Sequence, residues 1–278
     1  MFVDTHAHLT DEQFKDDWHQ VIKRARECNV DKIITSGFDY NSSVEAVNFS
    51  NKNENVFASI GVYPENIYEY NDDIENGLKE LAKNKKVVAI GEIGLQYTDD
   101  MPPKEKQIEV FVKQLSLACS LKKPIIIHCR DAYGDMIEIL KKNKNLLTYG
   151  GTFHCYSGSY EIAKEILKLG FYISVGGVST FKNAKNVQEM IAKIPLNRIL
   201  LETDCPYLAP TPYRGKRNAP FYIPTIAENL AKIKNVSVEE IAEVTTENVR
   251  RLFGIWLIII LKRSLDKILF QIKICYKQ

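Results

Sequence analysis

Short apolar runs rich in valine and isoleucine recur along this chain, separated by polar stretches and by glycine or proline. A continuous apolar run, without strict polar alternation, indicates a parallel strand that is buried on both faces. We assign eight such runs as strands. They cover residues 2–6, 31–37, 56–62, 87–94, 124–129, 150–155, 171–177 and 198–205.

The segments between these runs have apolar residues at helical spacing and polar opposite faces. They cover residues 11–28, 42–52, 73–84, 104–123, 134–143, 159–170 and 184–194, and two further helices, 221–235 and 237–254, follow the last strand. Eight alternating units predict one α/β domain, a closed TIM (β/α)8 barrel, over residues 1–254. A doubly wound open sheet is the alternative, although the first strand ends in THAHLTDEQ instead of a glycine-rich phosphate turn.

Composition places the chain among ordinary globular proteins. Of its 278 residues, 45% are hydrophobic and 26% are charged, which argues against disorder. The N-terminus has no leader-like segment, and no run of ~18 apolar residues occurs, so we expect a cytoplasmic protein. The six cysteines form no CxxC pair, which predicts reduced thiols instead of a disulfide framework.

The charge balance changes when the last residues are set apart. The net charge is +2, but residues 255–278 hold five Lys or Arg and one Asp, which leaves 32 basic and 34 acidic side chains before them. The barrel therefore has no general charge for polyanion binding. Any nucleic-acid contact must come from a local basic patch.

Polar residues collect at the ends of the predicted strands. Strand periodicity puts Asp4, His6 and His8 of DTHAHL on one face, although an isolated HxH also occurs in surface turns. A helix cap, a turn or a core histidine could explain each polar residue singly. Together they fall at the carboxyl ends of five strands, where a barrel builds its active site. The six candidate metal ligands are His6, His8, Glu92, His128, His154 and Asp204.

This set of side chains has a definite chemistry. Four imidazoles and two carboxylates are too many for one tetrahedral ion, but they suit two divalent ions bridged by a carboxylate, with positions open for water and substrate. The set predicts a hydrolase with two divalent metal ions, and Zn²⁺, Mn²⁺, Ni²⁺ and Mg²⁺ all fit such ligands. Cys129, Cys155 and Cys205 each follow a candidate ligand, so we expect them to face outward as packing residues.

Six motifs appear in order: DTHAHL, GEIGL, IHCRDA, HCYSG, ETDCPYL and TPYRGKRNAP. In these motifs the chain resembles the TatD family of metal-dependent deoxyribonucleases, within the amidohydrolase superfamily, from residue 2 to about residue 254. The resemblance implies a TIM barrel that uses divalent metals to remove nucleotides from the 3′ end of DNA, with single-stranded DNA preferred and RNA as a further substrate.

The resemblance also implies roles for the candidate residues. The ligands of the first ion would be His6, His8, Glu92 and Asp204, and those of the second ion Glu92, His128 and His154. Glu92 would then bridge the two ions. Asp204 would also act as general base for the water that attacks phosphorus.

Substrate contacts are expected close to these ligands. Arg130 follows His128 by two residues on the same face and is expected to contact a phosphate, the alternative being a salt bridge with Asp131. The loop after Asp204 is either a local basic patch with an aromatic that stacks on a base, or an ordinary proline-rich loop. Its candidate residues are Tyr213, Arg214, Lys216 and Arg217.

Glu202 shares a strand face with Asp204, so we expect it to orient a ligand or a water.

The chain departs from the family pattern in three places. Tyr63 stands where the family usually has the histidine of His-Pro, and Gln96 stands where it usually has the aspartate of GLD. Neither position is a metal ligand, so the departures concern substrate contacts. The third departure is the extension 255–278, whose apolar residues predict an amphipathic helix packed on the barrel or a partner, or alternatively lying on a membrane surface. These apolar residues are Leu261, Leu265, Ile268, Leu269 and Ile272.

Three functions are compatible with these features. The leading one is a phosphodiesterase that acts on DNA ends. The second uses the same ions on an ester or amide, as in a deacylase of D-aminoacyl-tRNA, and the third is an interaction module that keeps the metal site without catalysis. The expected partners are therefore DNA, RNA or tRNA, and we expect a monomer that does not bind a membrane.

Overall fold

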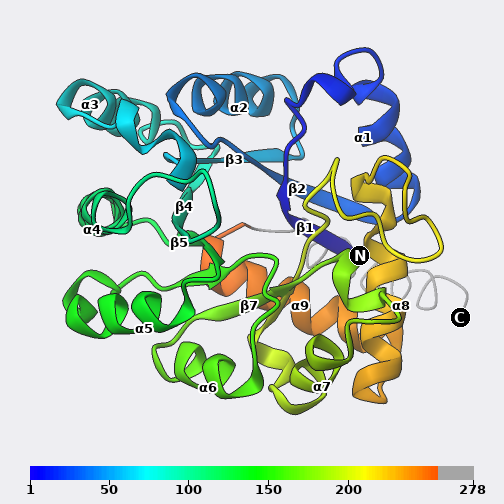
Figure 1. Ribbon diagram of the computed structural model, residues 1–278. Helices are drawn as coiled ribbons and strands as arrows, with labels where there is room; N and C mark the ends of the chain where they lie inside the picture. The colour runs from blue at the N-terminus through cyan, green and yellow to red at the C-terminus, as the bar shows by residue number, and fades with distance from the viewer. Residues whose placement is uncertain (256–278) are drawn as a thin grey trace, which may run out of the picture.

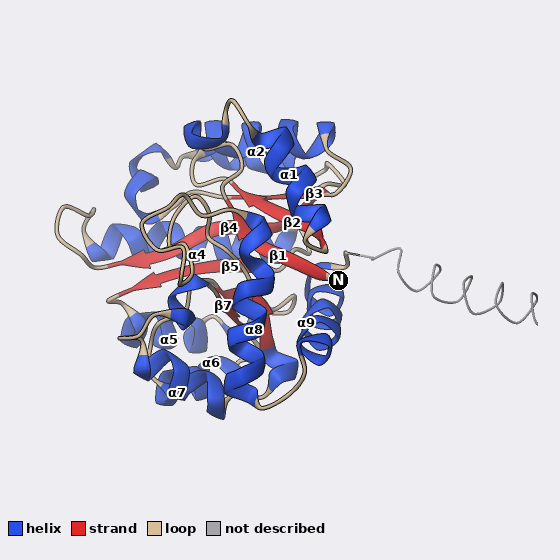
Figure 2. Cartoon of the chain, turned by 90° about the vertical axis from the view of Figure 1, so that its right-hand side faces the viewer, coloured by secondary structure: helices blue, strands red, loops and turns tan. Residues whose placement is uncertain are grey.

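A computed structural model describes residues 1–255 of the chain. The amphipathic helix predicted for residues 255–278 lies outside the described residues, apart from Ile255. Figures 1 and 2 show strands at the centre of the molecule with helices arranged around them. No helix within residues 1–255 is long and apolar enough to cross a membrane.

The eight predicted strands are all present and form one parallel sheet in the order β1 to β8. Their bounds are β1 Phe2–Ala7, β2 Val30–Ser36, β3 Val56–Ile60, β4 Val87–Gln96, β5 Ile125–Arg130, β6 Gly151–Phe153, β7 Tyr172–Val175 and β8 Ile199–Leu201. A parallel bridge between Ala7 and Cys205 joins the two ends of the sheet. The TIM-barrel prediction is confirmed.

Nine α-helices lie between or after the strands of residues 1–255. They are α1 Trp18–Glu27, α2 Tyr40–Lys52, α3 Asp72–Leu81, α4 Lys104–Ser120, α5 Tyr133–Lys142, α6 Tyr160–Lys168, α7 Lys185–Lys193, α8 Ile223–Lys234 and α9 Val238–Phe253. Six short 3-10 helices complete them: η1 Glu12–Phe14, η2 Pro64–Glu69, η3 Lys144–Leu146, η4 Gly177–Thr180, η5 Leu196–Arg198 and η6 Pro220–Tyr222.

Local sequence explains where these helices begin and end. The Ser237 side chain accepts a hydrogen bond from the N–H of Glu240 at the start of α9, and Gly254, with φ of 67°, ends the helix. The single helix predicted for residues 11–28 is instead divided into η1 and α1. The Asp11 side chain caps η1, and the fully buried Phe14 turns this segment into the core before α1 starts.

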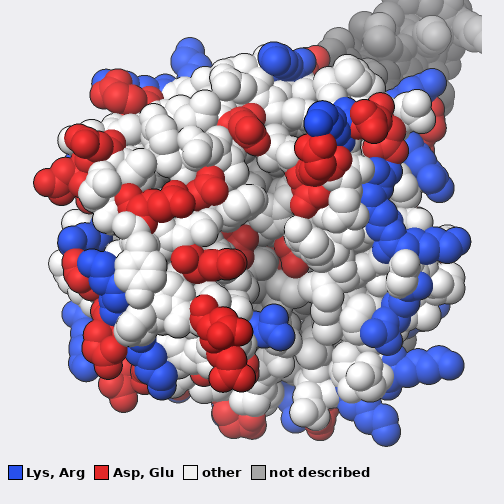
Figure 3. Space-filling model, turned by 45° about the horizontal axis from the view of Figure 1, so that its top comes forward, with Lys and Arg blue, Asp and Glu red and all other residues white. Residues whose placement is uncertain are grey.

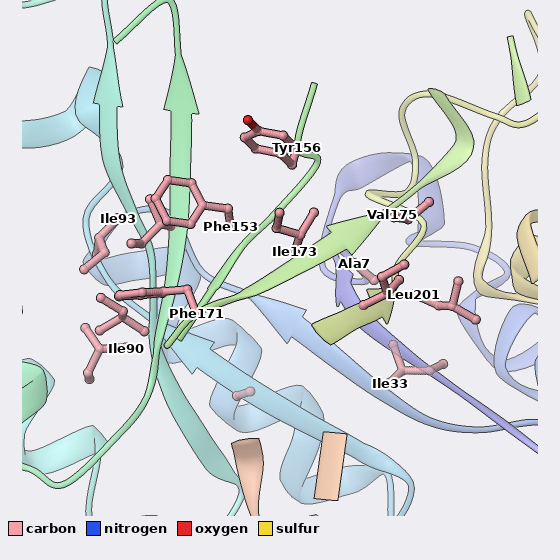
Figure 4. Packing of buried hydrophobic residues seen from close by; sticks show 14 of the residues in the cluster. Ala7, Ile33, Ile90, Ile93, Phe153, Tyr156, Phe171, Ile173, Val175 and Leu201 are labelled. Atoms are coloured by element: carbon pink, nitrogen blue, oxygen red, sulfur yellow. The ribbon is translucent and has the colours of Figure 1, made fainter. Parts of the chain in front are cut away.

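Two apolar clusters hold the barrel together. The larger one fills the space between strands and helices, and Figure 4 shows its residues, including Phe153 and Phe171, whose ring centroids are 5.7 Å apart. The smaller cluster joins Val249 and Phe253 of α9 to residues such as Val3, which lies near the amino end of its strand. Helix α9 therefore covers the amino-terminal end of the barrel, opposite the end where the candidate ligands lie.

The barrel closes between β1 and the chain after β8 through a buried carboxylate. Asp4 is fully buried, and its oxygens accept hydrogen bonds from the Thr203 N–H at 2.9 Å and the Thr203 hydroxyl at 2.6 Å. Thr5 adds a hydrogen bond from its hydroxyl to the Leu201 carbonyl at 2.9 Å. These bonds tie the first strand to the segment that carries Asp204.

We expect Asp4→Ala to lower the free energy of unfolding by about 2–3 kcal/mol, because it leaves two buried Thr203 donors without an acceptor. Urea unfolding followed by circular dichroism measures this loss. Asp16→Ala, at an exposed position, is the matched control and is expected to change stability by less than about 0.5 kcal/mol. Equal stability of the two variants would contradict the role of Asp4 in closing the barrel.

Candidate metal centre

Glu92 lies at the centre of the predicted ligands, with 4% of its surface exposed. It was expected at the end of its strand, but it lies within β4, where the pairing with β5 shifts register between Ile90 and Ile93. This irregularity interrupts regular pairing at the residue that must meet several partners. His128 likewise lies within β5. His8 and His154 directly follow the last residues of β1 and β6, and Asp204 lies in the loop after β8.

The Glu92 carboxylate divides the four histidines into two pairs. Its Oε1 lies 2.9 Å from His128 Nδ1 and 2.9 Å from His154 Nε2. Its Oε2 lies 3.3 Å from His6 Nε2 and 3.7 Å from His8 Nε2. One carboxylate oxygen therefore faces each pair, which is the arrangement that a bridging ligand requires.

The ligand atoms fit divalent cations. Two groups have all their ligand atoms within 4.8 Å of one another, one formed by His6, Glu92 and His154 and the other by His6, His8 and Asp204. Imidazole nitrogens also lie close to each other, at 3.2 Å for His6 Nε2 and His8 Nε2 and at 3.0 Å for His128 Nδ1 and His154 Nε2. Two neutral imidazoles at this separation could bind one cation, as ligands on one zinc-like ion stand about 3.3 Å apart.

Ser36, at the end of β2, orients both histidines of the first strand, and sequence analysis did not single it out. Its carbonyl accepts a hydrogen bond from His8 Nδ1 at 3.2 Å, which turns His8 Nε2 toward the Glu92 and Asp204 carboxylates. Its hydroxyl lies 3.2 Å from His6 Nδ1 and accepts a bond from the Ser59 hydroxyl at 2.9 Å. The only indication of this role in the sequence was that Ser36 lies near the end of the second predicted strand, which neighbours the first strand in a barrel.

Glu92 stays ionised although it is buried. Burial by itself would raise its pKa, but the charge of His154 and hydrogen bonds from His128 and His154 hold the pKa of Glu92 well below its usual value. Burial opposes the charge of His154, yet attraction to Glu92 raises the pKa of His154 to about 10. Burial and the His154 charge lower the pKa of His6 to about 4. The protein alone therefore holds a buried Glu92–His154 ion pair.

Asp204 is the most accessible carboxylate of the centre. Its side chain is 14% exposed, against 5% for Glu92, and its Oδ1 lies 3.6 Å from His6 Nε2 and 3.5 Å from His8 Nε2. Its φ of 57° is left-handed, a conformation that aspartate tolerates, and its N–H donates to the His6 carbonyl at 2.9 Å. Burial would raise the pKa of Asp204, but the hydrogen bond from His8 and the neighbouring imidazoles lower it.

Glu202 lies behind His154, where the sequence led us to expect an orienting residue. Its Oε1 accepts a hydrogen bond from the Cys155 N–H and lies 3.9 Å from His154 Nδ1. Burial raises the pKa of Glu202 to about 8. Glu202 Oε2 and His154 Nδ1 are buried without a hydrogen-bond partner in the described residues.

The two departures from the family pattern meet at His128. Gln96 Oε1 lies 2.9 Å from His128 Nε2 and accepts a hydrogen bond from the Tyr63 hydroxyl at 2.5 Å, while the Gln96 amide group donates to Thr98 Oγ1 at 2.8 Å. Because Gln96 Nε2 is already a donor to Thr98, its oxygen is the acceptor for the His128 N–H. The imidazole of His128 is therefore supported by a neutral amide, where the family usually has a carboxylate.

The candidate phosphate contacts have different environments. The exposed Arg130 side chain makes no hydrogen bond or ion pair within residues 1–255, so the alternative salt bridge with Asp131 does not form. Lys216 is also exposed. Arg214 lies over the Phe181 ring at 4.0 Å, and Tyr213 stacks on Tyr222 with centroids 4.4 Å apart.

Arg217 is engaged within the protein. It forms two hydrogen bonds to the Asp17 carboxylate, at 2.9 and 2.6 Å, and a further one to the Gln13 carbonyl.

The cysteines next to the ligands are absent from both candidate ligand groups in the described residues, and burial raises the pKa of Cys155 and Cys205.

Comparisons with known proteins agree with this geometry. A family model described as TatD related DNase matches residues 3–254. The metal-dependent hydrolase YabD of Bacillus subtilis is 46% identical over 255 residues, which cover 92% of this chain and 100% of YabD. The 3′-5′ ssDNA/RNA exonuclease TatD of Rahnella sp. is 34% identical over 253 residues, 89% of this chain and 96% of that protein.

A solved structure shows the same architecture. The crystal structure of YJJV, a TatD homologue from Escherichia coli, superposes with a TM-score of 0.87 at 30% sequence identity and covers 92% of this chain and 98% of that chain. The resemblance drawn from the sequence motifs is therefore confirmed over residues 3–254.

We expect divalent cations to bind with release of a proton from His154. Its pKa of about 10 keeps the ring protonated at neutral pH, whereas coordination needs the neutral ring. Affinity should therefore rise about tenfold per pH unit and level off near pH 10. Calorimetric titration with Mn²⁺ in buffers of different ionisation enthalpy counts the released protons, and an affinity independent of pH between 6 and 9 would contradict this assignment.

We expect Gln96→Glu to tighten Mn²⁺ binding about tenfold, because a carboxylate of the same size makes His128 a more basic ligand, and Gln96→Ala to weaken it about as much. Calorimetry measures both. Gln20→Glu, on the exposed side of α1, is the matched control. Unchanged affinity in both Gln96 variants would show that the amide does not support the metal centre.

Proposed function

Because the chain belongs to the family of TatD-related DNases, we propose that this metal-dependent hydrolase is a 3′-5′ exonuclease that prefers single-stranded DNA. The observation that carries the proposal is the division of the four histidines by Glu92, with Asp204 beside one pair. Two divalent ions bound there would supply Lewis acidity, which acidifies a water and neutralises charge on a phosphoryl group. The name of the Rahnella relative supports the choice of substrate.

Glu92 and the histidines act mainly by position. Glu92 would bridge the ions, with His6, His8 and Asp204 on one side and His128 and His154 on the other. The Ser36 carbonyl and the Gln96 amide hold two of these rings in the orientation that directs a lone pair at the centre. Glu202, at 3.9 Å from His154 Nδ1, would orient a third ring.

Asp204 is the proton acceptor in this proposal. It is the more exposed carboxylate, and its lowered pKa keeps it ionised at neutral pH. Its carboxylate would take the proton of the attacking water, so that negative charge is directed at phosphorus. No other carboxylate of the centre combines ionisation with access to solvent in the described residues.

Arg130 would bind a phosphate oxygen of the substrate. It is exposed next to the centre and carries a charge that nothing in residues 1–255 neutralises by direct contact. Lys216 is exposed and makes no ion pair within residues 1–255, whereas Arg214 and Tyr213 already contact aromatic rings of the barrel. The proposed phosphate contacts are therefore led by Arg130 and Lys216, with Arg214 and Tyr213 in support.

The test uses a 5′-labelled single-stranded DNA oligonucleotide with Mg²⁺ or Mn²⁺. We expect a ladder of shortened products with the wild type and at least about a 100-fold slower reaction with Asp204→Asn, because the variant has no general base. Asp16→Asn is the control and should digest like the wild type. Digestion from the 5′ end would instead release the label at once as a short product.

Two outcomes would overturn the proposal. Equal ladders from the wild type and Asp204→Asn would show that the activity does not arise at this centre. No ladder from protein shown by calorimetry to bind metal would show that DNA is not the substrate. The ester of an aminoacyl-tRNA would then be the next substrate to assay.

A further inference from the structure

Two exposed aromatic side chains stand beside the metal centre. Among residues 1–255, the exposed large hydrophobic side chains are Met1, Phe38, Tyr68, Tyr207 and Leu208. Phe38 is 40% exposed and follows β2, and Tyr207 is 51% exposed and follows β8. These two strands flank β1, so the two rings rise from either side of the strand that carries His6 and His8. We refer to Phe38 and Tyr207 as the aromatic pair.

Both rings approach the same candidate ligand. The Phe38 centroid lies 6.0 Å from that of His8 with the planes at 65°, and the Tyr207 centroid lies 6.2 Å away at 63°. Each contact runs between an edge and a face, so neither ring is stacked on His8. An aromatic group of a substrate held at this centre would therefore lie within reach of both members of the pair.

The aromatic pair is exposed on rigid backbone. The Phe38 N–H donates to Ser42 Oγ at 2.9 Å, and its carbonyl accepts from the Tyr63 N–H at 2.8 Å. The Tyr207 N–H donates to the Asp204 carbonyl at 3.0 Å, and its hydroxyl donates to Asp11 Oδ2 at 2.9 Å. Exposed rings on a backbone that is fixed by hydrogen bonds lose less entropy when a ligand binds than rings on an unbonded loop, as a recognition surface requires.

The charges around the centre do not favour a polyanion strongly. Figure 3 shows a hollowed face on which Asp and Glu gather around the hollow, while Lys and Arg are concentrated at the right, with fewer at the left edge and one group beside the hollow. Arg217 is paired with Asp17, and Arg214 lies over Phe181, so two of the three cations of the predicted basic loop are engaged within the protein. A substrate strand therefore needs a source of affinity besides phosphate attraction, and stacking of bases on aromatic rings is such a source.

We propose that Phe38 and Tyr207 form a stacking subsite for an unpaired nucleobase next to the phosphate that the centre hydrolyses. The ligand class is a flat, uncharged aromatic heterocycle on a single strand, because a base in a duplex does not expose its face. This subsite rests on the proposed nuclease function and deepens it. It accounts for a preference for single strands without a base-specific hydrogen bond.

The test is a double-mutant cycle between the protein and the substrate. One oligonucleotide carries ordinary bases, and the other carries abasic residues in its last three 3′ positions. We expect Phe38→Leu and Tyr207→Leu each to lower kcat/KM on the ordinary strand about 5- to 100-fold and to leave kcat/KM on the abasic strand within about twofold. Phe38→Trp and Tyr207→Phe keep an aromatic ring and should retain the wild-type value.

A second readout does not depend on turnover. With 2-aminopurine at the 3′ end, stacking quenches its fluorescence when the strand binds to Asp204→Asn protein in Mg²⁺. Adding Phe38→Leu should abolish the quenching. Tyr68→Leu removes another exposed ring, one that makes no ring contact within residues 1–255, and should change neither readout.

The outcomes separate this inference from the proposed function. Equal losses on the ordinary and abasic strands, or no loss on either, would overturn the stacking subsite while the nuclease stands. A Tyr68→Leu effect equal to that of Phe38→Leu would overturn it as well. Failure of the metal-loaded wild type to digest the ordinary strand would overturn the nuclease proposal, and the subsite with it.

Discussion

The structure depends on burying the carboxylate of Glu92 in the mouth of a barrel. An isolated buried carboxylate costs several kcal/mol, so it is tolerated only with close partners. Here four imidazoles from β1, β5 and their neighbours surround it, with two on each oxygen. A buried carboxylate would destabilise an ordinary core. Here it is stable only because side chains from several segments of the chain converge on it. His154, with its pKa of about 10, supplies positive charge beside the ionised Glu92 and Asp204.

That convergence requires the two ends of the barrel sequence to meet. His6 and His8 lie near the first residue, whereas Asp204 follows the eighth strand, and regular ladder pairing between β1 and β8 is limited to the bridge of Ala7 with Cys205. Asp4 supplies the missing connection through Thr203. The DTHAHL motif therefore combines two tasks, since its aspartate closes the barrel and its histidines face the centre that this closure completes.

The sequence was sufficient to predict the features that the order of apolar and polar residues determines. Eight apolar runs alternating with helical segments predicted the barrel, and six candidate ligands at strand ends predicted side chains that meet, as they do around Glu92. It was insufficient where a tertiary contact decides the outcome. Nothing local to Arg217 shows that Asp17 will pair with it, and nothing local to Ser36 shows that two histidines will face it. Glu92 was placed at a strand end because apolar periodicity does not report a register shift inside a strand.

The same limit applies to Tyr63 and Gln96, which look like two unrelated departures in the sequence. In the structure they form one hydrogen-bonded unit with His128, in which the amide oxygen accepts from both the phenol and the imidazole. An amide in place of a carboxylate removes a negative charge beside His128 and would make His128 a weaker electron-pair donor to a bound cation. A more weakly coordinated cation is a stronger Lewis acid, so the amide would lower the affinity for an ion held by His128 and raise the electrophilicity of that ion.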